Sequence, residues 1–88
     1  MANFIGGSAG AMANQIAEGF ILLSANTLRG FTPGDLGALR AELDKLQRET
    51  RALVPPADDA LANQARNRKI GRLSSAMQIV SHKLTAKN

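Results

Sequence analysis

Residues 31–53 read FTPGDLGALRAELDKLQRETRAL, and this stretch decides the fold. Its leucines stand three and four positions apart, the spacing of a helix that packs along its length against other helices. They are Leu36, Leu39, Leu43, Leu46 and Leu53, with Thr50 in the remaining position of the series. Thr32 is placed to cap the first turn, Pro33 suits the first helical position, and Asp35 stands where the acid of a capping box belongs. The sequence therefore predicts a helix over residues 33–53 that requires other helices beside it.

A second helix is predicted over residues 57–85. The pair Pro55-Pro56 ends the preceding helix, because proline cannot continue one, and the short connection favours an antiparallel pair. The apolar stripe of this second helix consists of Ile70, Leu73, Met77, Val80 and Leu84. Toward its start the stripe is thin, with only Leu61 and Ala65, so we expect that half to pack more loosely. The expected helix contact joins Leu36, Leu39, Leu43 and Leu46 to Ile70, Leu73, Met77 and Val80.

The third predicted helix covers residues 9–28, ahead of the other two. Its apolar residues spread around much of the circumference, so we expect it to be buried on more than one side. Ile16, Phe20 and Leu23 are the side chains expected to cover the hairpin. Residues 20–23, FILL, also fit a short buried strand, since periodicity does not separate helix from strand over four residues. The flanking alanines favour the helix.

Composition predicts one all-α domain that spans all 88 residues. Its hydrophobic content of 44% rests on Ala, Leu and Ile, with three Phe and no Tyr or Trp, which suits closely packed helices better than sheets. The expected architecture is an antiparallel helical hairpin covered by an apolar N-terminal helix, with residues 1–8 as a flexible tail. A chain of this size buries only about 60–65% of its unfolded surface, so association adds needed stability. We therefore expect no stable monomer.

The residues that usually carry catalysis are sparse or unpaired in this sequence. There is no cysteine, and the one histidine, His82, has no acid near it in the sequence. Asp58 and Asp59 suit the start of a helix better than acid–base chemistry. The glycine-containing stretch GGSAG lacks the Lys-Ser/Thr ending of a phosphate-binding loop. We expect neither an enzyme nor a bound metal or cofactor.

The net charge of +4 lies entirely after Pro56, where six basic residues face two acids. Four of the basic residues form a cluster that is a candidate contact for anions or nucleic acid: Arg66, Arg68, Lys69 and Arg72. Three interpretations stay open, namely a solvated face, a contact with an acidic protein, and a phosphate contact. No aromatic residue is interleaved to stack on bases. If the cluster is a solvated face or a protein contact, neutralising it is expected to leave folding nearly intact, because exposed charges affect stability little.

Function is expected to lie in protein interaction. The sequence predicts a non-enzymatic structural subunit that self-associates as a homo-oligomer, or docks on a larger protein assembly, through apolar helix faces. The alternative is a small basic nucleic-acid-binding protein that uses the 66–72 cluster. Residues 9–23 are too short and too interrupted for a membrane span, which needs about 20 apolar residues. We expect no secretory signal in residues 1–15, because they have no positively charged start and a broken apolar core. We expect a cytoplasmic chain, with export that needs no signal peptide left open.

Overall fold

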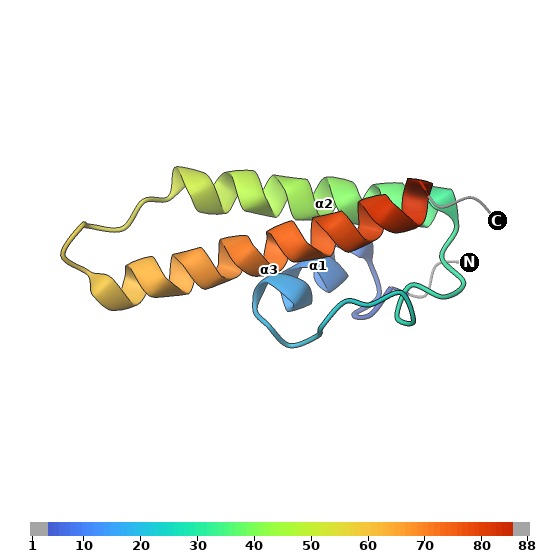
Figure 1. The fold of residues 1–88 in the computed structure, drawn as a ribbon, viewed down its shortest axis with the longest axis horizontal. Helices are drawn as coiled ribbons and strands as arrows, with labels where there is room; N and C mark the ends of the chain where they lie inside the picture. The colour runs from blue at the N-terminus through green and yellow to red at the C-terminus, as the bar shows by residue number, and fades with distance from the viewer. Residues whose placement is uncertain (1–3, 86–88) are drawn as a thin grey trace.

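The computed structural model describes residues 4–85, and these form three helices. They are α1 (Ala9–Ala17), α2 (Pro33–Ala52) and α3 (Ala60–Thr85). In Figure 1, α2 and α3 run antiparallel, side by side, and the much shorter α1 lies against one face of this hairpin. No strand occurs within residues 4–85. The predicted all-α fold, a helical hairpin covered by an N-terminal helix, is confirmed.

The start of α2 follows the predicted capping chemistry. The Thr32 hydroxyl oxygen accepts a hydrogen bond from the Asp35 N–H at 3.1 Å, and the Asp35 carboxylate accepts one from the Thr32 N–H at 3.0 Å. Pro33 occupies the first turn, where a missing N–H costs nothing. The last helix also begins with a cap, since the Asp59 carboxylate accepts from the Ala62 N–H at 3.0 Å. It therefore starts at Ala60, three residues later than predicted.

The first helix ends at Ala17, well short of the predicted end at residue 28. Gly19 has φ = +82°, a left-handed conformation that glycine adopts without strain. Around it, the Phe20 N–H donates to the Gln15 carbonyl at 2.9 Å and the Gly19 N–H to the Ile16 carbonyl at 3.1 Å. This pair of bonds is the Schellman motif, which terminates helices. The prediction of a helix through residues 18–28 is therefore wrong, because a glycine stop outweighs the apolar periodicity.

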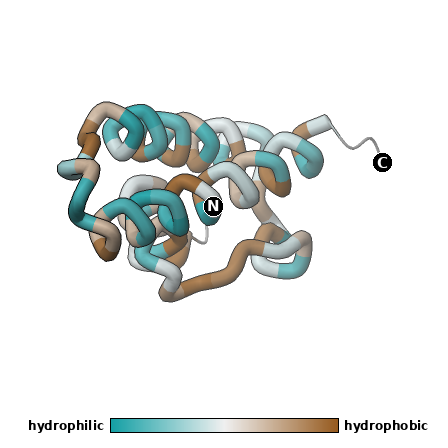
Figure 2. Tube along the Cα trace, turned by 60° about the vertical axis from the view of Figure 1, so that its left-hand side comes forward, coloured by the Kyte–Doolittle hydropathy of each residue, from teal (hydrophilic) through white to brown (hydrophobic). Residues whose placement is uncertain are grey.

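Residues 18–32 form an irregular connection that contains a hydrophobic stretch, visible in Figure 2 directly after α1. The FILL segment is neither helix nor strand. Within it Leu23 is buried, but Phe20 is 77% exposed, so the expectation that Phe20 covers the hairpin is wrong. Further along, Leu28 and Phe31 turn back into the core, and the Phe31 ring meets Phe4 edge-to-face at 5.4 Å. The connection thus acts as a second covering layer beside α1.

The hydrophobic core lies between α1, the connection and the half of the hairpin farther from its turn. Its members are Met12, Ala13, Ile16, Ala17, Leu23, Leu28, Phe31, Leu36, Leu39, Leu43, Leu73, Ala76 and Val80. All three buried residues of α3 fall in its second half, as the thin stripe near Leu61 predicted. Of the expected flexible tail, residues 1–3 lie outside the described residues, while Ser8 caps α1 by accepting from the Ala11 N–H at 3.1 Å. None of the helices within residues 4–85 has the length and apolar character needed to cross a membrane.

Candidate functional site

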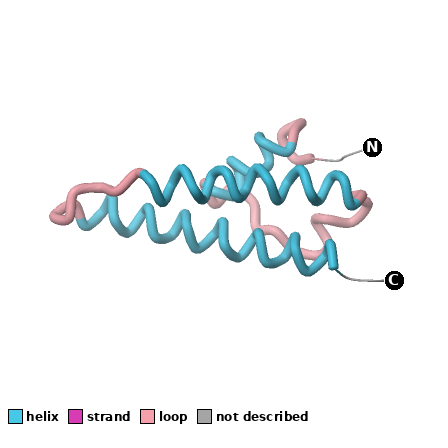
Figure 3. Tube along the Cα trace, turned by 90° about the horizontal axis from the view of Figure 1, so that it is seen from above, coloured by secondary structure: helices cyan, strands magenta, loops and turns pink. Residues whose placement is uncertain are grey.

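Within the part of the chain that the structure describes, no third helix lies over the half of the hairpin that contains its turn. We call residues 48–72 the distal hairpin; it projects beyond α1 in Figures 1 and 3. Thr50 is the only buried residue among these 25 positions. Three large apolar side chains near the turn are exposed to solvent: Leu53 at 75%, Val54 at 71% and Leu61 at 80%. We call these three residues the apolar tip, and large apolar side chains that remain exposed are candidates for an interaction surface.

Polar bonds, rather than buried leucines, hold the two helices together where the core ends. The Gln47 side-chain amide donates to the Ser74 hydroxyl at 2.6 Å and to the Ile70 carbonyl at 3.5 Å. Thr50 uses its hydroxyl within its own helix, where it donates to the Leu46 carbonyl at 2.7 Å. From residue 51 around the turn to residue 72, every residue is at least partly exposed to solvent.

Arg66 joins the two helices nearest the turn by capping the end of α2. Its Nε donates to the carbonyls of Thr50 and Leu53, both at 3.2 Å, and its Nη2 donates to the Arg51 carbonyl at 2.9 Å. The last carbonyls of a helix lack partners within the helix and carry partial negative charge. A guanidinium group supplies several donors in a fixed plane, so one side chain satisfies three carbonyls.

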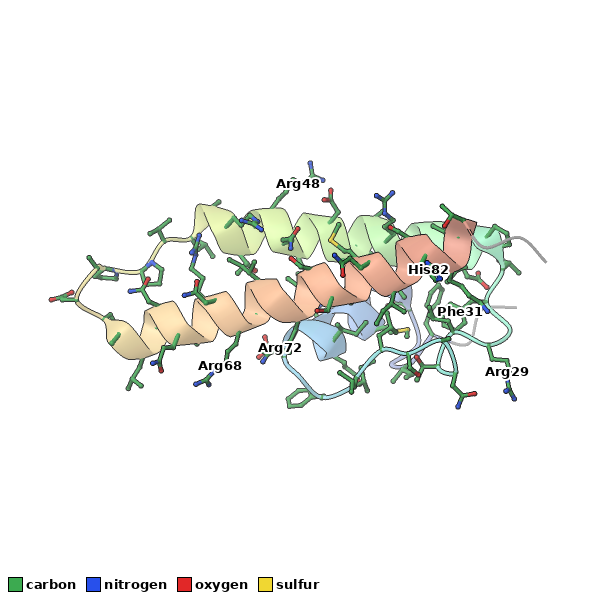
Figure 4. The ribbon with its side chains drawn as sticks, in the orientation of Figure 1. Arg29, Phe31, Arg48, Arg68, Arg72 and His82 are labelled. Carbon is green, nitrogen blue, oxygen red and sulfur yellow. The ribbon has the colours of Figure 1, made fainter. Side chains whose placement is uncertain are left out.

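Arg72 performs the same task for α1. Its Nε donates to the Ala17 carbonyl at 2.8 Å and so ties the end of α1 to α3. Lys69 lies beside it and forms an ion pair with Glu18 at 3.5 Å. Arg68 is exposed, and Figure 4 shows it with Arg72 on the side of α3 turned away from α2. The four-residue basic cluster is therefore divided, because two arginines cap helices, the lysine pairs with an acid, and Arg68 projects into solvent.

A groove lies directly beyond the end of α1, between α2 and α3. Its volume is about 340 Å³, and we call it the cationic groove. It is lined by Glu18, Thr50, Leu53, Ala65, Arg66, Lys69 and Arg72. Glu18 is the C-cap residue of α1, so the groove begins where the third helix stops. Its lining combines three cations and one carboxylate with small and apolar side chains.

A second, smaller groove of about 230 Å³ runs between the connection and α3. Its lining is almost entirely apolar and comes from Ile16, Ile21, Leu22, Leu23, Gly71, Arg72, Ser75, Ala76 and Ile79. Leu22 is 90% exposed at its edge. Arg72 borders both grooves, which places its guanidinium group between the covered and uncovered parts of the hairpin.

Most residues predicted to form a protein interface lie inside the single chain. Buried among them are Ile16, Leu23, Leu36, Leu39, Leu43, Leu73 and Val80, and half-buried are Leu46, Ile70 and Met77. These side chains make the contact between helices of one molecule, so they are not available to a partner while the fold is intact.

The exposed apolar tip was missed by the prediction. Its signal in the sequence was the thin stripe around Leu61 together with the two prolines that follow Val54.

The described residues offer little that resembles a reaction centre. Within residues 4–85 no three His, Cys, Asp or Glu side chains gather as potential metal ligands. His82 is exposed near the end of α3, beside Lys83 and Gln78. Comparison of the sequence with protein-family models and curated proteins, and of the fold with solved structures, found no match. The features that the geometry does bring together are the apolar tip and the cationic groove.

Proposed function

We propose that this chain is a non-enzymatic helical interaction protein that binds other protein chains through its distal hairpin. The observation that carries the proposal is the exposure of Leu53, Val54 and Leu61 on a hairpin arm without a third helix. Full burial of one such side chain contributes about 1.5–3 kcal/mol, so covering all three supports a real affinity. The absence of cysteine in the sequence suits a reducing compartment, and the cytoplasm is the proposed location.

Two kinds of partner suit this surface, a second copy of the chain and a component of a larger protein assembly. The distal hairpin carries six basic and three acidic side chains, so two copies that meet there repel each other at low salt. Salt screens this repulsion, since the Debye length falls from about 30 Å at 0.01 M to about 8 Å at 0.15 M. Self-association through the apolar tip is therefore expected to strengthen, not weaken, as salt is added.

Nucleic-acid binding is the second candidate function, favoured by one feature of α3. The helix Ala60–Thr85 carries five basic side chains and no acidic one. Against it, Arg66 and Arg72 already donate to backbone carbonyls, which leaves Arg68 as the most exposed member of the cluster. Binding through so few phosphates gives weak affinity that moderate salt removes.

The test is the mass of the purified chain by light scattering, across concentration and at low and high salt. We expect the mass to rise above one chain with concentration, most clearly in high salt. Replacing Leu53 and Leu61 by Ser together should keep the chain monomeric without affecting its fold, because both side chains are exposed. Leu22→Ser, at an exposed position outside the distal hairpin, is the matched control and should associate like the parent.

A chain that stays monomeric at every concentration and salt, with the double variant indistinguishable from it, would contradict a binding role for the apolar tip. Adding duplex or single-stranded nucleic acid to the same samples tests the second candidate. A tight complex whose log affinity falls with log salt by about 0.7–0.9 per phosphate over several phosphates would place nucleic acid first.

A further inference from the structure

We propose that the cationic groove receives an acidic amphipathic helix of another protein, in the third-helix position that α1 leaves empty. This inference rests on the proposed function, because it specifies the partner that the distal hairpin binds. A helix seated there would cover Leu53 and Ala65 and would bring carboxylates to Arg66, Lys69 and Arg72.

The position of the groove is the first reason. α1 packs against both α2 and α3 and completes the bundle over the half of the hairpin that it reaches. At Gly19 the chain reverses into the connection, and the same inter-helix surface continues uncovered as the cationic groove. Its lining includes Thr50 and Ala65, whose short side chains let another helix approach closely. A helix in this place would extend the three-helix packing towards the turn.

Charge determines the chemistry of the occupant. Ion pairs within residues 4–85 involve Asp44 with Arg48 and Glu18 with Lys69, so neither Arg66 nor Arg72 has a carboxylate partner there. Both guanidinium groups are held in place by their bonds to helix carbonyls. Side chains that are already ordered lose less entropy when a ligand binds, which favours affinity. Glu18 compensates only one of the three cations that line the groove.

A second copy of the chain does not supply the negative charge that would balance the cations of the groove. Its own distal hairpin has an excess of three basic side chains, and like charges placed across an interface oppose association. The groove also lacks aromatic side chains on which nucleic-acid bases could stack. An acidic helix with one apolar stripe would contact the small and apolar lining residues with its stripe and would bring carboxylates to the three cations.

The experiment uses the intact chain and two synthetic helical peptides of about 18 residues, or five turns. One peptide has a leucine stripe with Glu at the flanking positions, and the other has Gln in place of every Glu. Fluorescence anisotropy at low salt should show the Glu peptide binding about tenfold tighter or more, with the difference shrinking in high salt as charges are screened. Equal affinity for the two peptides would overturn the proposal.

Two substitutions locate the site. Lys69→Glu reverses one positive charge in the lining of the groove. Ala65→Glu adds a negative charge to the lining and leaves the native ion pairs intact. Each substitution should weaken binding of the Glu peptide by about tenfold, because it places a negative charge against the glutamates of the peptide. Arg40→Glu makes the same charge change as Lys69→Glu at an exposed position of α2 outside the groove, and should leave affinity nearly unchanged. Far-UV circular dichroism checks the fold of every variant.

Equal losses in Lys69→Glu and Arg40→Glu would overturn the proposal, because they would show a response to overall charge and not to the groove. Displacement of the Glu peptide by a nucleic-acid duplex would also overturn it. Failure of the proposed function gives a different result from failure of this inference. If the apolar tip has no binding role, the Leu53→Ser, Leu61→Ser double variant changes neither self-association nor peptide binding. If that variant abolishes association while the Glu and Gln peptides bind equally, only the present inference fails.

Discussion

Single arginine side chains connect parts of this chain that are far apart in sequence. The bond from Arg72 to the Ala17 carbonyl spans 55 residues, and Arg66 reaches carbonyls 13 to 16 residues away. Both meet the C-terminal end of a helix, where unpaired carbonyls and the helix dipole favour a cation. Because of these bonds, we expect neutralisation of Arg66 or Arg72 to destabilise the fold, and neutralisation of the exposed Arg68 to leave it nearly intact.

The first prediction compares two arginines four residues apart on α3. Arg72→Gln should lower the free energy of unfolding by about 1–3 kcal/mol, since it removes a charge-assisted hydrogen bond to a helix end. Arg68→Gln should change it by less than about 0.5 kcal/mol, as is usual for an exposed side chain. Chemical denaturation followed by circular dichroism measures both. Equal stability of the two variants would show that the Arg72 contact contributes nothing.

At the scale of elements, one glycine determines how much of the hairpin is covered. Gly19 takes a positive φ and closes the Schellman motif, so α1 stops after two and a half turns. The apolar residues that follow cannot then continue along the groove, and Phe20 and Leu22 are left exposed in the connection. The uncovered distal hairpin is the consequence of this early stop.

The second prediction contrasts two glycines. Gly19→Ala should destabilise the fold by about 1–2 kcal/mol, because an L side chain is strained at positive φ. Gly37→Ala should instead stabilise it by about 0.5–1 kcal/mol, since Gly37 lies within α2 and an added Cβ meets nothing within 4 Å. Thermal melts of the two variants provide the measurement. A Gly19→Ala protein that melts above the parent would mean that α1 extends past Ala17.

Features set by neighbouring residues were predictable, and features set by long-range contacts were not. The cap formed by Thr32 and Asp35 is encoded within one turn of helix and appears as predicted. The leucine seam of α2 is buried from Leu36 to Leu43, but the prediction that it continues to Leu53 is wrong, because that side chain lies past the end of α2 and is 75% exposed. The stop at Gly19 was not predicted, although a glycine inside the predicted helix of residues 9–28 was the available signal for it. The cationic groove required knowing that α1 ends beside Arg72, which no local pattern in the sequence contains.

The whole molecule is elongated, with extents of 48 × 24 × 19 Å, and its buried core occupies one part of that length. The covered part of the hairpin contains Leu39, Leu43, Leu73 and Val80, all without solvent exposure. Within the distal hairpin, Arg66 connects the two helices, and Gln47 joins them just before it begins. The covered part is therefore expected to be the stable unit of the protein, and the distal hairpin the part that a partner stabilises.

Hydrogen exchange along the hairpin tests this central claim most directly. Local opening is easier where few apolar contacts are buried, so amides in residues 50–68 should exchange at least about tenfold faster than those near Leu43 and Leu73. Addition of the acidic helical peptide should slow exchange in residues 50–72 and leave the covered part unchanged. Uniform protection along both helices of the free chain would contradict the account, because it would mean that the distal hairpin is already complete without a partner.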